Sequence, residues 1–311
     1  MTGPFTGLDV VVAGCGIGGA AAALLLAGGG ARVTLLERVR VPKAVGAAIL
    51  LAPNGLAVLY GLGFAPFLAE HGCRGSLTRI QDAAGRPITL GEIPDFGSGL
   101  DHSLLIRRSD LLGMLVAAVQ AHPRIDAHFG AEVAGATPAG RVSAREDGQG
   151  YTLDATLVIG ADGVHSCVRT QGRFGARVTP TRTSYVRGLV PVQVALPALV
   201  TDSWTSLGRF GMGPVPEGTY FFTSVRAPDL ARALAQRDWA AFRGLWQQAY
   251  PPAGAVLSRV ERFEDLLVNE VVRIDCQRFV DGRLVLLGDA AHAMSPALAQ
   301  GANSALVGHP A

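Results

Sequence analysis

The chain has 311 residues, of which 49% are hydrophobic and 17% are charged, and its formal net charge at pH 7 is +2. A chain of this length and composition can bury a large core, and we expect it to form two lobes. The near-balance of 27 basic and 25 acidic residues, with no dense basic run, removes any electrostatic reason to expect nucleic acid or an anionic membrane surface as a partner.

Three predicted elements open the chain. Residues 8–13 form a short apolar run that ends in glycines, which is typical of a buried parallel strand. Residues 18–27 are rich in Ala and Leu and predict a helix, which the glycines at 28–30 end. Residues 33–36 predict the second strand. This β-α-β unit indicates a doubly wound sheet.

The charge-free stretch 10–31 could be mistaken for a signal peptide or a membrane span. Asp9 precedes it, so a basic first region is missing, and the stretch is rich in glycine and runs directly into the second strand. We reject both interpretations and expect no association with a membrane.

The hydrophobic periodicity of the sequence changes along the segments that follow. Helical periodicity over 109–121 and an apolar strand over 153–159 continue the nucleotide-type pattern. Short alternating runs between Gly and Pro turns over 185–225 predict an antiparallel sheet. Residues 228–249 predict one amphipathic helix, with Trp239 and Trp246 on a single buried face, and residues 283–287 predict a last buried strand. These segments predict an α/β fold in which a sheet domain is inserted into the doubly wound one.

The four cysteines, Cys15, Cys73, Cys167 and Cys276, are far apart and lack the spacing of metal ligands. Scattered single thiols are typical of a reducing compartment rather than of a disulfide framework. We therefore expect a cytoplasmic protein without a structural metal, and we assign Cys15 to packing.

Three glycines, Gly14, Gly16 and Gly19, have the spacing Gly-x-Gly-x-x-Gly directly after the first strand. The first permits a tight turn, the second lets a pyrophosphate approach the backbone, and the third lets helix and strand pack closely. Glu37 ends the second strand, about 20 residues further on, where an acidic group accepts hydrogen bonds from a ribose. The combination predicts a dinucleotide site, against the alternative of a merely structural turn, without distinguishing FAD from NAD.

Four further motifs resemble those of the flavoprotein aromatic hydroxylases, the group A monooxygenases related to p-hydroxybenzoate hydroxylase. Residues 160–169 resemble the Asp-Gly motif of that family, and residues 288–303 resemble its Gly-Asp motif. Residues 105–112 resemble its arginine-containing helix entry, and residues 46–54 resemble the loop after the ribose-binding acid. The resemblance extends over most of the chain. It implies a Rossmann-type FAD-binding doubly wound sheet with an inserted antiparallel β-sheet that binds substrate.

The resemblance also implies a role for each matched residue. Asp289 would hold hydroxyl groups of FAD, Arg108 would reach the pyrophosphate, and Asp162 would support the phosphate region and the approach of the nicotinamide cofactor. Pro296 would flank the isoalloxazine, and backbone groups of residues 301–303 would face its pyrimidine edge. Ordinary turn capping is the alternative for the two aspartates. The expected cofactor-binding residues are Gly14, Gly16, Gly19, Glu37, Arg38, Gly46, Arg108, Asp162, Gly163, Gly288, Asp289, Pro296, Gly301 and Asn303.

No catalytic residue is assigned from the sequence. His165 and His292 lie inside family motifs, and we expect them to serve loop packing rather than a proton shuttle. The residues of the inserted sheet that could meet a substrate cannot be ranked, because no spacing distinguishes them. They are Tyr185, Arg209, Tyr220 and Phe222.

The activity implied by the resemblance is monooxygenation of a small aromatic or polyketide-like substrate. NADPH or NADH would reduce FAD, O2 would add to form a flavin C4a-hydroperoxide, and one oxygen would pass to the substrate by hydroxylation or epoxidation. A composition high in Ala, Gly and Arg is typical of a high-GC bacterial gene, in which such enzymes often serve secondary metabolism. We expect a monomer or a homodimer.

The implied domains are interleaved along the chain. Segments 1–75, 101–175 and 270–311 would form the FAD-binding domain, and segments 76–100 and 176–269 the substrate-binding sheet. The family continues through further helices after the Gly-Asp motif, whereas Gly308 and Pro310 here stop the helix that begins at Asn303. We therefore expect the usual C-terminal helices to be absent.

Three alternatives remain open. A flavin-dependent halogenase shares the glycine and Gly-Asp regions, but its Trp-rich signature and catalytic lysine have no counterpart beyond Lys43. A flavin-dependent reductase or dehydrogenase of the same fold would not oxygenate its substrate. The third alternative is an inactive, truncated homologue.

Overall fold

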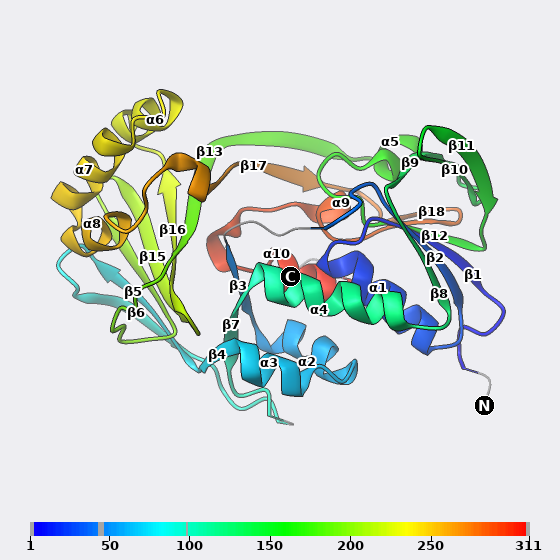
Figure 1. Ribbon diagram of the computed structural model, residues 1–311, viewed down its shortest axis with the longest axis horizontal. Coiled ribbons are helices and arrows are strands. Elements are labelled where there is room, and N and C mark those ends of the chain that lie inside the picture. The colour runs from blue at the N-terminus through cyan, green and yellow to red at the C-terminus, as the bar shows by residue number, and fades with distance from the viewer. Residues whose placement is uncertain (1–2, 43–46, 98, 309–311) are drawn as a thin grey trace.

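The computed structural model describes residues 3–42, 47–97 and 99–308 (Figure 1). Its first sheet has six strands in the order β18-β19-β12-β1-β2-β8. Only β18 is antiparallel, so the other five strands share one carboxyl edge. The strands are β1 (Asp9–Ala13), β2 (Arg32–Glu37), β8 (Ile125–Phe129), β12 (Leu157–Gly160), β18 (Val280–Asp281) and β19 (Leu284–Leu286).

Helices cover one face of this sheet. The helices α1 (Ile17–Gly28) and α4 (Arg108–Ala121) run side by side across the sheet in Figure 1, and both contribute to its largest buried core. Short, aliphatic side chains allow this close approach, with Ala20 and Leu111 fully buried. The helix α10 (Gly301–Val307) packs against α1 and against α2 (Pro53–Gly61).

Two smaller sheets flank the first one. An antiparallel sheet of β9 (Ala131–Ala136), β10 (Arg141–Glu146) and β11 (Gln149–Asp154) packs on the opposite face, together with α5 (Cys167–Gln171). The other consists of β3 (Ala48–Leu51), β7 (Ser103–Arg107) and β4 (Gly72–Gly75), next to α3 (Ala65–His71).

The second lobe is a seven-stranded sheet in the order β17-β13-β16-β15-β14-β5-β6. Its outer face carries α6 (Pro228–Ala235), α7 (Trp239–Ala249) and α8 (Pro251–Leu257), which stand apart from the first lobe in Figure 1. The strands are β5 (Leu77–Asp82), β6 (Pro87–Glu92), β13 (Arg177–Val190), β14 (Val200–Thr205), β15 (Gly208–Val215), β16 (Gly218–Val225) and β17 (Leu267–Asp275). The predicted fold class, a Rossmann-type sheet with an inserted antiparallel sheet, is confirmed.

The single strand predicted over 153–159 is wrong, because this run forms the end of β11 and the start of β12, in two different sheets. Ala155 donates its backbone N–H to Gly140 O at 2.9 Å, and Thr156 donates to Asp9 O at 2.8 Å. Consecutive residues thus bond to different partners. A continuous apolar run carries no signal for such a change of partner.

The single helix predicted over 228–249 is also wrong, because it is broken into α6 and α7. Arg237 has a φ of +54°, which a right-handed α-helix does not accommodate. The side chain of Asp238 then caps α7 by accepting from Ala241 N at 2.9 Å. The expectation that both tryptophans face the core is confirmed. Trp246 is fully buried, and Trp239 packs on the same cluster and donates its indole N–H to Val260 O.

Across the described part of the chain, no helix is long and apolar enough to cross a membrane.

His128 connects the edge strand β8 of the first sheet to the small β9-β10-β11 sheet. One ring nitrogen lies 3.2 Å from Glu146 Oε2, and the other lies 3.1 Å from Asp126 Oδ2. Partial burial alone would lower the pKa of His128, but hydrogen bonds and charge attraction from the two carboxylates outweigh it and raise the pKa above its usual value. The protonated ring therefore stabilises the junction between the two sheets.

This contact predicts a pH-dependent contribution to stability. Because the folded-state pKa is raised, the contribution is complete below the unfolded value of about 6.5 and disappears as pH rises through the raised folded value. We expect His128→Gln to lower the thermal unfolding midpoint by about 1–3 °C at pH 6. Well above the raised pKa the variant and the parent should coincide. An equal difference at both pH values would show that the charge of His128 does not matter.

Candidate functional site

The parallel register brings distant segments of the chain together at one edge of the first sheet. Ala13, the last residue of β1, is paired with Leu36 of β2 and with Gly160 of β12, and Gly160 is paired with Leu286 of β19. The loops that follow these strands are therefore neighbours. The chain reverses its direction of winding between β1 and β12, and this is where doubly wound sheets bind ligands.

The three glycines of the first loop have different structural roles. Gly14 has a φ of +100°, and a Cβ there would lie 2.5 Å from Ala161 O. A Cβ on Gly19 would lie 2.1 Å from Gly14 O, so this glycine is required where α1 meets the strand. A Cβ on Gly16 would meet nothing within 4 Å. Gly16 is thus not needed by the packing of the chain, and it leaves an open cradle at the start of α1.

The N-terminus of α1 faces this cradle without a side-chain cap. Its first N–H groups have no partner within the helix, and the helix dipole places positive charge at the same end. Both features suit a phosphate.

Glu37 ties the glycine loop to the end of β2. Its carboxylate accepts from Cys15 N at 2.8 Å and from Val39 N at 2.9 Å. Each carboxylate oxygen can accept more than one hydrogen bond, so capacity for ribose hydroxyls remains. Burial, followed by the charge of Glu37, raises the pKa of Cys15 to about 12, which keeps this thiol neutral, as a packing role requires.

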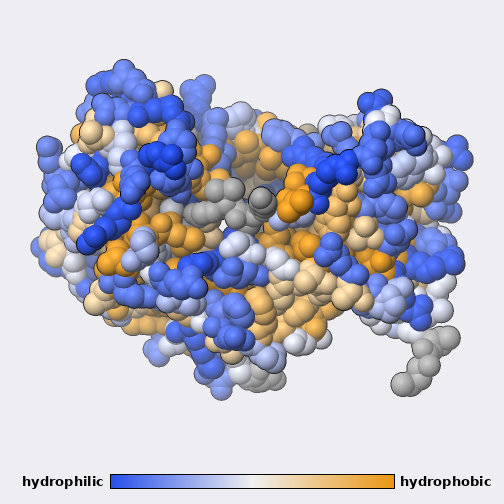
Figure 2. All heavy atoms as spheres, viewed as in Figure 1, coloured by the Kyte–Doolittle hydropathy of each residue, from blue (hydrophilic) through white to orange (hydrophobic). Residues whose placement is uncertain are grey.

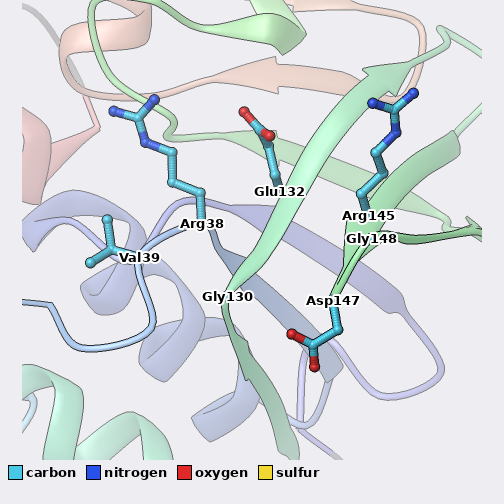
Figure 3. A pocket seen from close by; sticks show the side chains of 7 residues that line it. All are labelled: Arg38, Val39, Gly130, Glu132, Arg145, Asp147 and Gly148. Carbon is cyan, nitrogen blue, oxygen red and sulfur yellow. The ribbon is translucent and has the colours of Figure 1, made fainter.

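A pocket of about 480 Å³ lies beyond Glu37 (Figure 3). Its walls come from the end of β2, the start of β9 and the hairpin after β10. The residues that line it are Arg38, Val39, Gly130, Glu132, Arg145, Asp147 and Gly148. An ion pair between Arg40 and Asp147 joins the turn after β10 to the segment after β2. Arg38 and Val39 directly follow Glu37, so the pocket adjoins the end of β2, and none of its lining residues belongs to the Gly-Asp motif.

Asp162 follows β12 and uses only part of its carboxylate within the chain. Oδ2 accepts from Cys167 N at 2.7 Å and from Val168 N at 3.2 Å, which caps α5. Oδ1 is buried and has no hydrogen-bond partner. Buried polar atoms are nearly always paired in native proteins. Turn capping therefore accounts for one oxygen, and the other is available to a ligand.

The buried Arg169 joins the Asp-Gly loop to the Gly-Asp loop. Its guanidinium donates to Val164 O at 2.6 Å and to Ala290 O at 2.9 Å, and Ser166 Oγ accepts from its backbone N–H at 2.9 Å. The sequence analysis included Arg169 in a motif but assigned it no role. The signal that could have found it is a charged residue at the start of a short helix in an otherwise small-residue loop.

Arg108 and Asp289 form a charged centre, because the charge of each shifts the pKa of the other. Both residues are accessible to solvent although protein surrounds them. Partial burial raises the pKa of the Asp289 carboxyl, against the charges of Arg108 and His292. The pKa of the Arg108 guanidinium is lowered, mainly by burial. The negative charge of Asp289 opposes this shift, and the positive charge of Arg187 adds to it. The structure therefore brings Arg108, the first residue of α4, within electrostatic reach of the Gly-Asp loop.

The rest of the Gly-Asp segment is positioned by its backbone. Gly288, with a φ of +60°, starts α9 (Asp289–His292), and Pro296 starts a short 3-10 helix (Pro296–Leu298). Gly301 at the start of α10 has open space around it. The position of Gly46 lies outside the described residues.

Asn303 has a structural role that the sequence analysis missed. Its fully buried amide accepts from Ala52 N and donates to Leu50 O and Ala299 O, each at 2.9 Å. The side chain thereby holds β3 and α2 against α10. Its backbone N–H lies in the first turn of α10, where N–H groups have no partner within the helix.

The inserted sheet meets the small β3-β7-β4 sheet through an apolar cluster. Leu105 of β7 and Ala48 of β3 pack with Val215 and Tyr220 of the second lobe. Hydrophobic surface gathers around the hollow between the two lobes in Figure 2. Of the residues that the sequence could not rank, Tyr185 and Tyr220 are buried in this region, and Phe222 is half-buried.

The side chain of Arg209 bonds to other residues of this chain. Its guanidinium pairs with the buried Asp202 and donates to Ala297 O at 3.1 Å. It therefore anchors the Pro296 segment to the inserted sheet.

Comparison with known proteins finds FAD-binding proteins and monooxygenases. Residues 7–307 match the family model described as an FAD binding domain. The chain is 35% identical to 3-amino-4-hydroxybenzoate 2-monooxygenase of Streptomyces cremeus, over 96% of this chain and 75% of that protein. It is 30% identical to 6-methylpretetramide 4-monooxygenase of Streptomyces rimosus, over 96% of this chain and 72% of that protein. Among solved structures, 2-methyl-3-hydroxypyridine-5-carboxylic acid oxygenase superposes with a TM-score of 0.82 at 26% identity, covering 96% of this chain and 80% of that one.

The glycine loop predicts that three matched substitutions separate binding from folding. Gly16→Ala meets no protein atom, so it should leave the unfolding midpoint unchanged while weakening FAD binding by about tenfold or more. Gly19→Ala should lower stability by about 1–3 kcal/mol through overpacking. Gly28→Ala, in open space at the end of α1, is the control and should be neutral or stabilising by up to about 1 kcal/mol. Fluorescence titration with FAD and thermal unfolding provide the two measurements. Unchanged FAD affinity in Gly16→Ala would exclude this loop as the phosphate cradle.

Arg169 predicts a loss of stability together with a loss of binding. Arg169→Met keeps most of the side-chain length but leaves two carbonyl groups without their donor, which should destabilise the fold by about 2–4 kcal/mol and weaken FAD binding. The control is Arg173→Met, because the side chain of Arg173 is 85% exposed. Urea unfolding of both variants measures the difference. A stability change in Arg169→Met no larger than in Arg173→Met would contradict the assignment.

Proposed function

Because the chain belongs to the family of FAD-dependent aromatic monooxygenases, we propose that it uses NADPH or NADH and O2 to hydroxylate or epoxidise a small aromatic or polyketide-like molecule. The observation that carries this proposal is the edge of the first sheet, where the open cradle at Gly16, the unpaired Asp162 Oδ1 and the Arg108–Asp289 centre lie together. These three features match the phosphates, polar groups and hydroxyls of FAD.

Different residues of the chain hold different parts of the cofactor. The N–H groups of α1 next to Gly14, Gly16 and Gly19, with Arg108, offset the charge of the pyrophosphate. Glu37 and Asp289 accept from ribose and ribityl hydroxyls. FAD, when bound, supplies the redox chemistry that activates oxygen.

The remaining residues are assigned to the two ends of the cofactor. Arg38 lies at the pocket beyond Glu37 and is proposed to face the adenosine end. Asp162, Gly163 and Gly288 lie on the loops between the two ends, and the open Asp162 oxygen accepts from a polar group of the ligand. Pro296, Gly301 and the backbone of Asn303 lie at the start of α10 and are proposed to line the flavin ring, where N–H donors stabilise negative charge on its pyrimidine edge.

The inserted sheet forms the part of the site that faces the substrate, and it keeps water out of the contact between the lobes. The cluster of Ala48, Leu105, Val215 and Tyr220 closes the joint between the lobes with apolar surface. Burial raises the pKa of Tyr220 to about 12, although a hydrogen bond and the charge of Arg187 oppose this, so the phenol keeps its proton at neutral pH. It can donate that proton in a hydrogen bond to a neighbouring acceptor.

The strand assignment supports a division into interleaved domains. We propose that segments 1–75, 101–175 and 270–311 bind FAD and that segments 76–100 and 176–269 bind substrate, since β5, β6 and β13–β16 all belong to the seven-stranded sheet. The strand β17 crosses the boundary at residue 270, because it pairs with β13 along its whole length. From the scattered thiols and balanced charge, we propose a cytoplasmic location, a monomer or homodimer, and no nucleic-acid partner.

The purified chain is therefore expected to be yellow. Its spectrum should show the bands of an oxidised flavin, at about 380 and 450 nm. Consumption of NADPH or NADH under air should rise when a phenolic substrate is added, and mass spectrometry should find a product with one added oxygen atom. Faster consumption with hydrogen peroxide as the only product would identify an oxidoreductase that does not oxygenate. A chain that takes up no FAD would refute the proposed function.

A further inference from the structure

The strand β6 is a free edge of the seven-stranded sheet. It is last in the strand order, after β5, and it lies at the margin of the second lobe in Figure 1. All of its residues are exposed, so no other described segment covers it. At the opposite end of the sheet β17 is partly covered, since Val271 and Ile274 are buried and Ile274 N donates to Ala293 O. The strand β6 therefore offers backbone groups that are free to pair.

The register of β5 and β6 shows which backbone groups of β6 point outward. Ile93 N donates to Ser76 O at 2.9 Å, and the residues of an antiparallel pair alternate between bonded and non-bonded positions. Thr89 therefore points its N–H and C=O groups toward β5. The even-numbered residues of 88–92 point theirs away from the sheet. Pro87, which has no N–H group, is not one of them, and the register shift of the pair also lies at that residue.

Two apolar side chains of β6 share the outer face of the sheet. Ile88 and Leu90 are each 55% exposed. Leu90 is paired with Arg79, and Gln81, on the same face of β5, bonds to Tyr250 OH between α7 and α8. The face is therefore the one that these helices cover further along the sheet. At β6 the helices leave both apolar side chains in contact with water.

The two ends of β6 carry charges of opposite sign. Next to its first end, Arg86 pairs with Asp82, and Arg79 donates to Gly85 O at 2.6 Å. The Nε of Arg79 is buried without an acceptor, and among the described residues no carboxylate pairs with this guanidinium. At the last end, the exposed Glu92 forms no ion pair in the described part of the chain. The first end is thus positive and the last end negative.

We propose that β6 pairs antiparallel with β6 of a second copy of this chain, around a two-fold axis at Thr89. The seven-stranded sheets of the two copies then form one continuous sheet. This register sets Ile88 of each copy opposite Leu90 of the other, and the outward backbone groups of the two strands meet. Glu92 of each copy approaches the positive end of the other. A two-fold interface requires a surface that is complementary to itself in this way.

Other registers lose these matches. A slip by one residue would set outward backbone groups of one strand against inward groups of the other. A slip by two would set Ile88 opposite Glu92, which separates the apolar pairs and moves the carboxylate away from the positive end. The pattern of β6 therefore selects Thr89 as the axis. A single pair of strands buries less than the roughly 1,600 Å² of a standard interface, so the dissociation constant is expected at about 1–100 µM.

Sedimentation velocity of the full chain over a range of concentrations tests the association. Leu90→Lys should weaken it at least about tenfold, because a charge replaces one side of each apolar pair. Val280→Lys is the matched control, since Val280 is 54% exposed on β18, the edge strand of the first sheet, and it should leave the association unchanged. Both variants should keep the unfolding midpoint of the parent. A chain that stays monomeric at about 100 µM, or a dimer that Leu90→Lys leaves intact, would overturn the inference.

Cysteine substitution tests the register. At the axis, Thr89→Cys brings the two Cα atoms to about 4.5 Å, within reach of a disulfide when oxidised glutathione is added. In Glu92→Cys the two Cα atoms lie about 20 Å apart along the strands, so no such disulfide is expected. A non-reducing gel should show a linked dimer for Thr89→Cys alone. Equal linkage of both variants, or no more than in the parent with its four native cysteines, would overturn the proposed pairing.

Discussion

The parallel pairing of β12 with both β1 and β19 is the constraint on which the rest of the structure depends. It brings the glycine loop, the Asp-Gly loop and the Gly-Asp loop to one edge, although up to about 270 residues separate them along the chain. Close packing then fixes their spacing, since Gly14 lies against Ala161, and Gly19 against Gly14. Arg169 adds a charged link between two of the loops. A cofactor that contacts all three meets a rigid, preorganised edge.

The charged side chains of Arg108 and Asp289 lie beside this rigid edge. Arg108 and Asp289 compensate each other in part, and the charge of Arg187 opposes the protonated form of Arg108. In a family whose cofactor carries out the redox chemistry, the protein controls which ring approaches and in which orientation.

Predictions from the sequence succeeded where a single local signal decided the structure. The glycine spacing, the apolar run before it and Glu37 after it defined the β-α-β unit, because each depends on neighbours within about 30 residues. The errors occurred where two signals compete over a short distance. The run 153–159 changes its pairing partner at Ala155 and Thr156, and the helix over 228–249 is broken by Arg237 in a left-handed conformation. None of these three residues is of a type that signals the change.

The sequence by itself determined the fold class, the family and the segments that form the edge of the first sheet, because these follow from motifs and periodicity. The tertiary structure alone decided how single side chains are used. It showed that Asp162 caps α5 with one oxygen and leaves the other unpaired, and that the Asn303 amide holds three backbone segments together. It also showed that Arg209 pairs with Asp202 and donates to Ala297 O. The physical reason is that these roles depend on partners brought close by sheet register and packing, which sequence distance does not record.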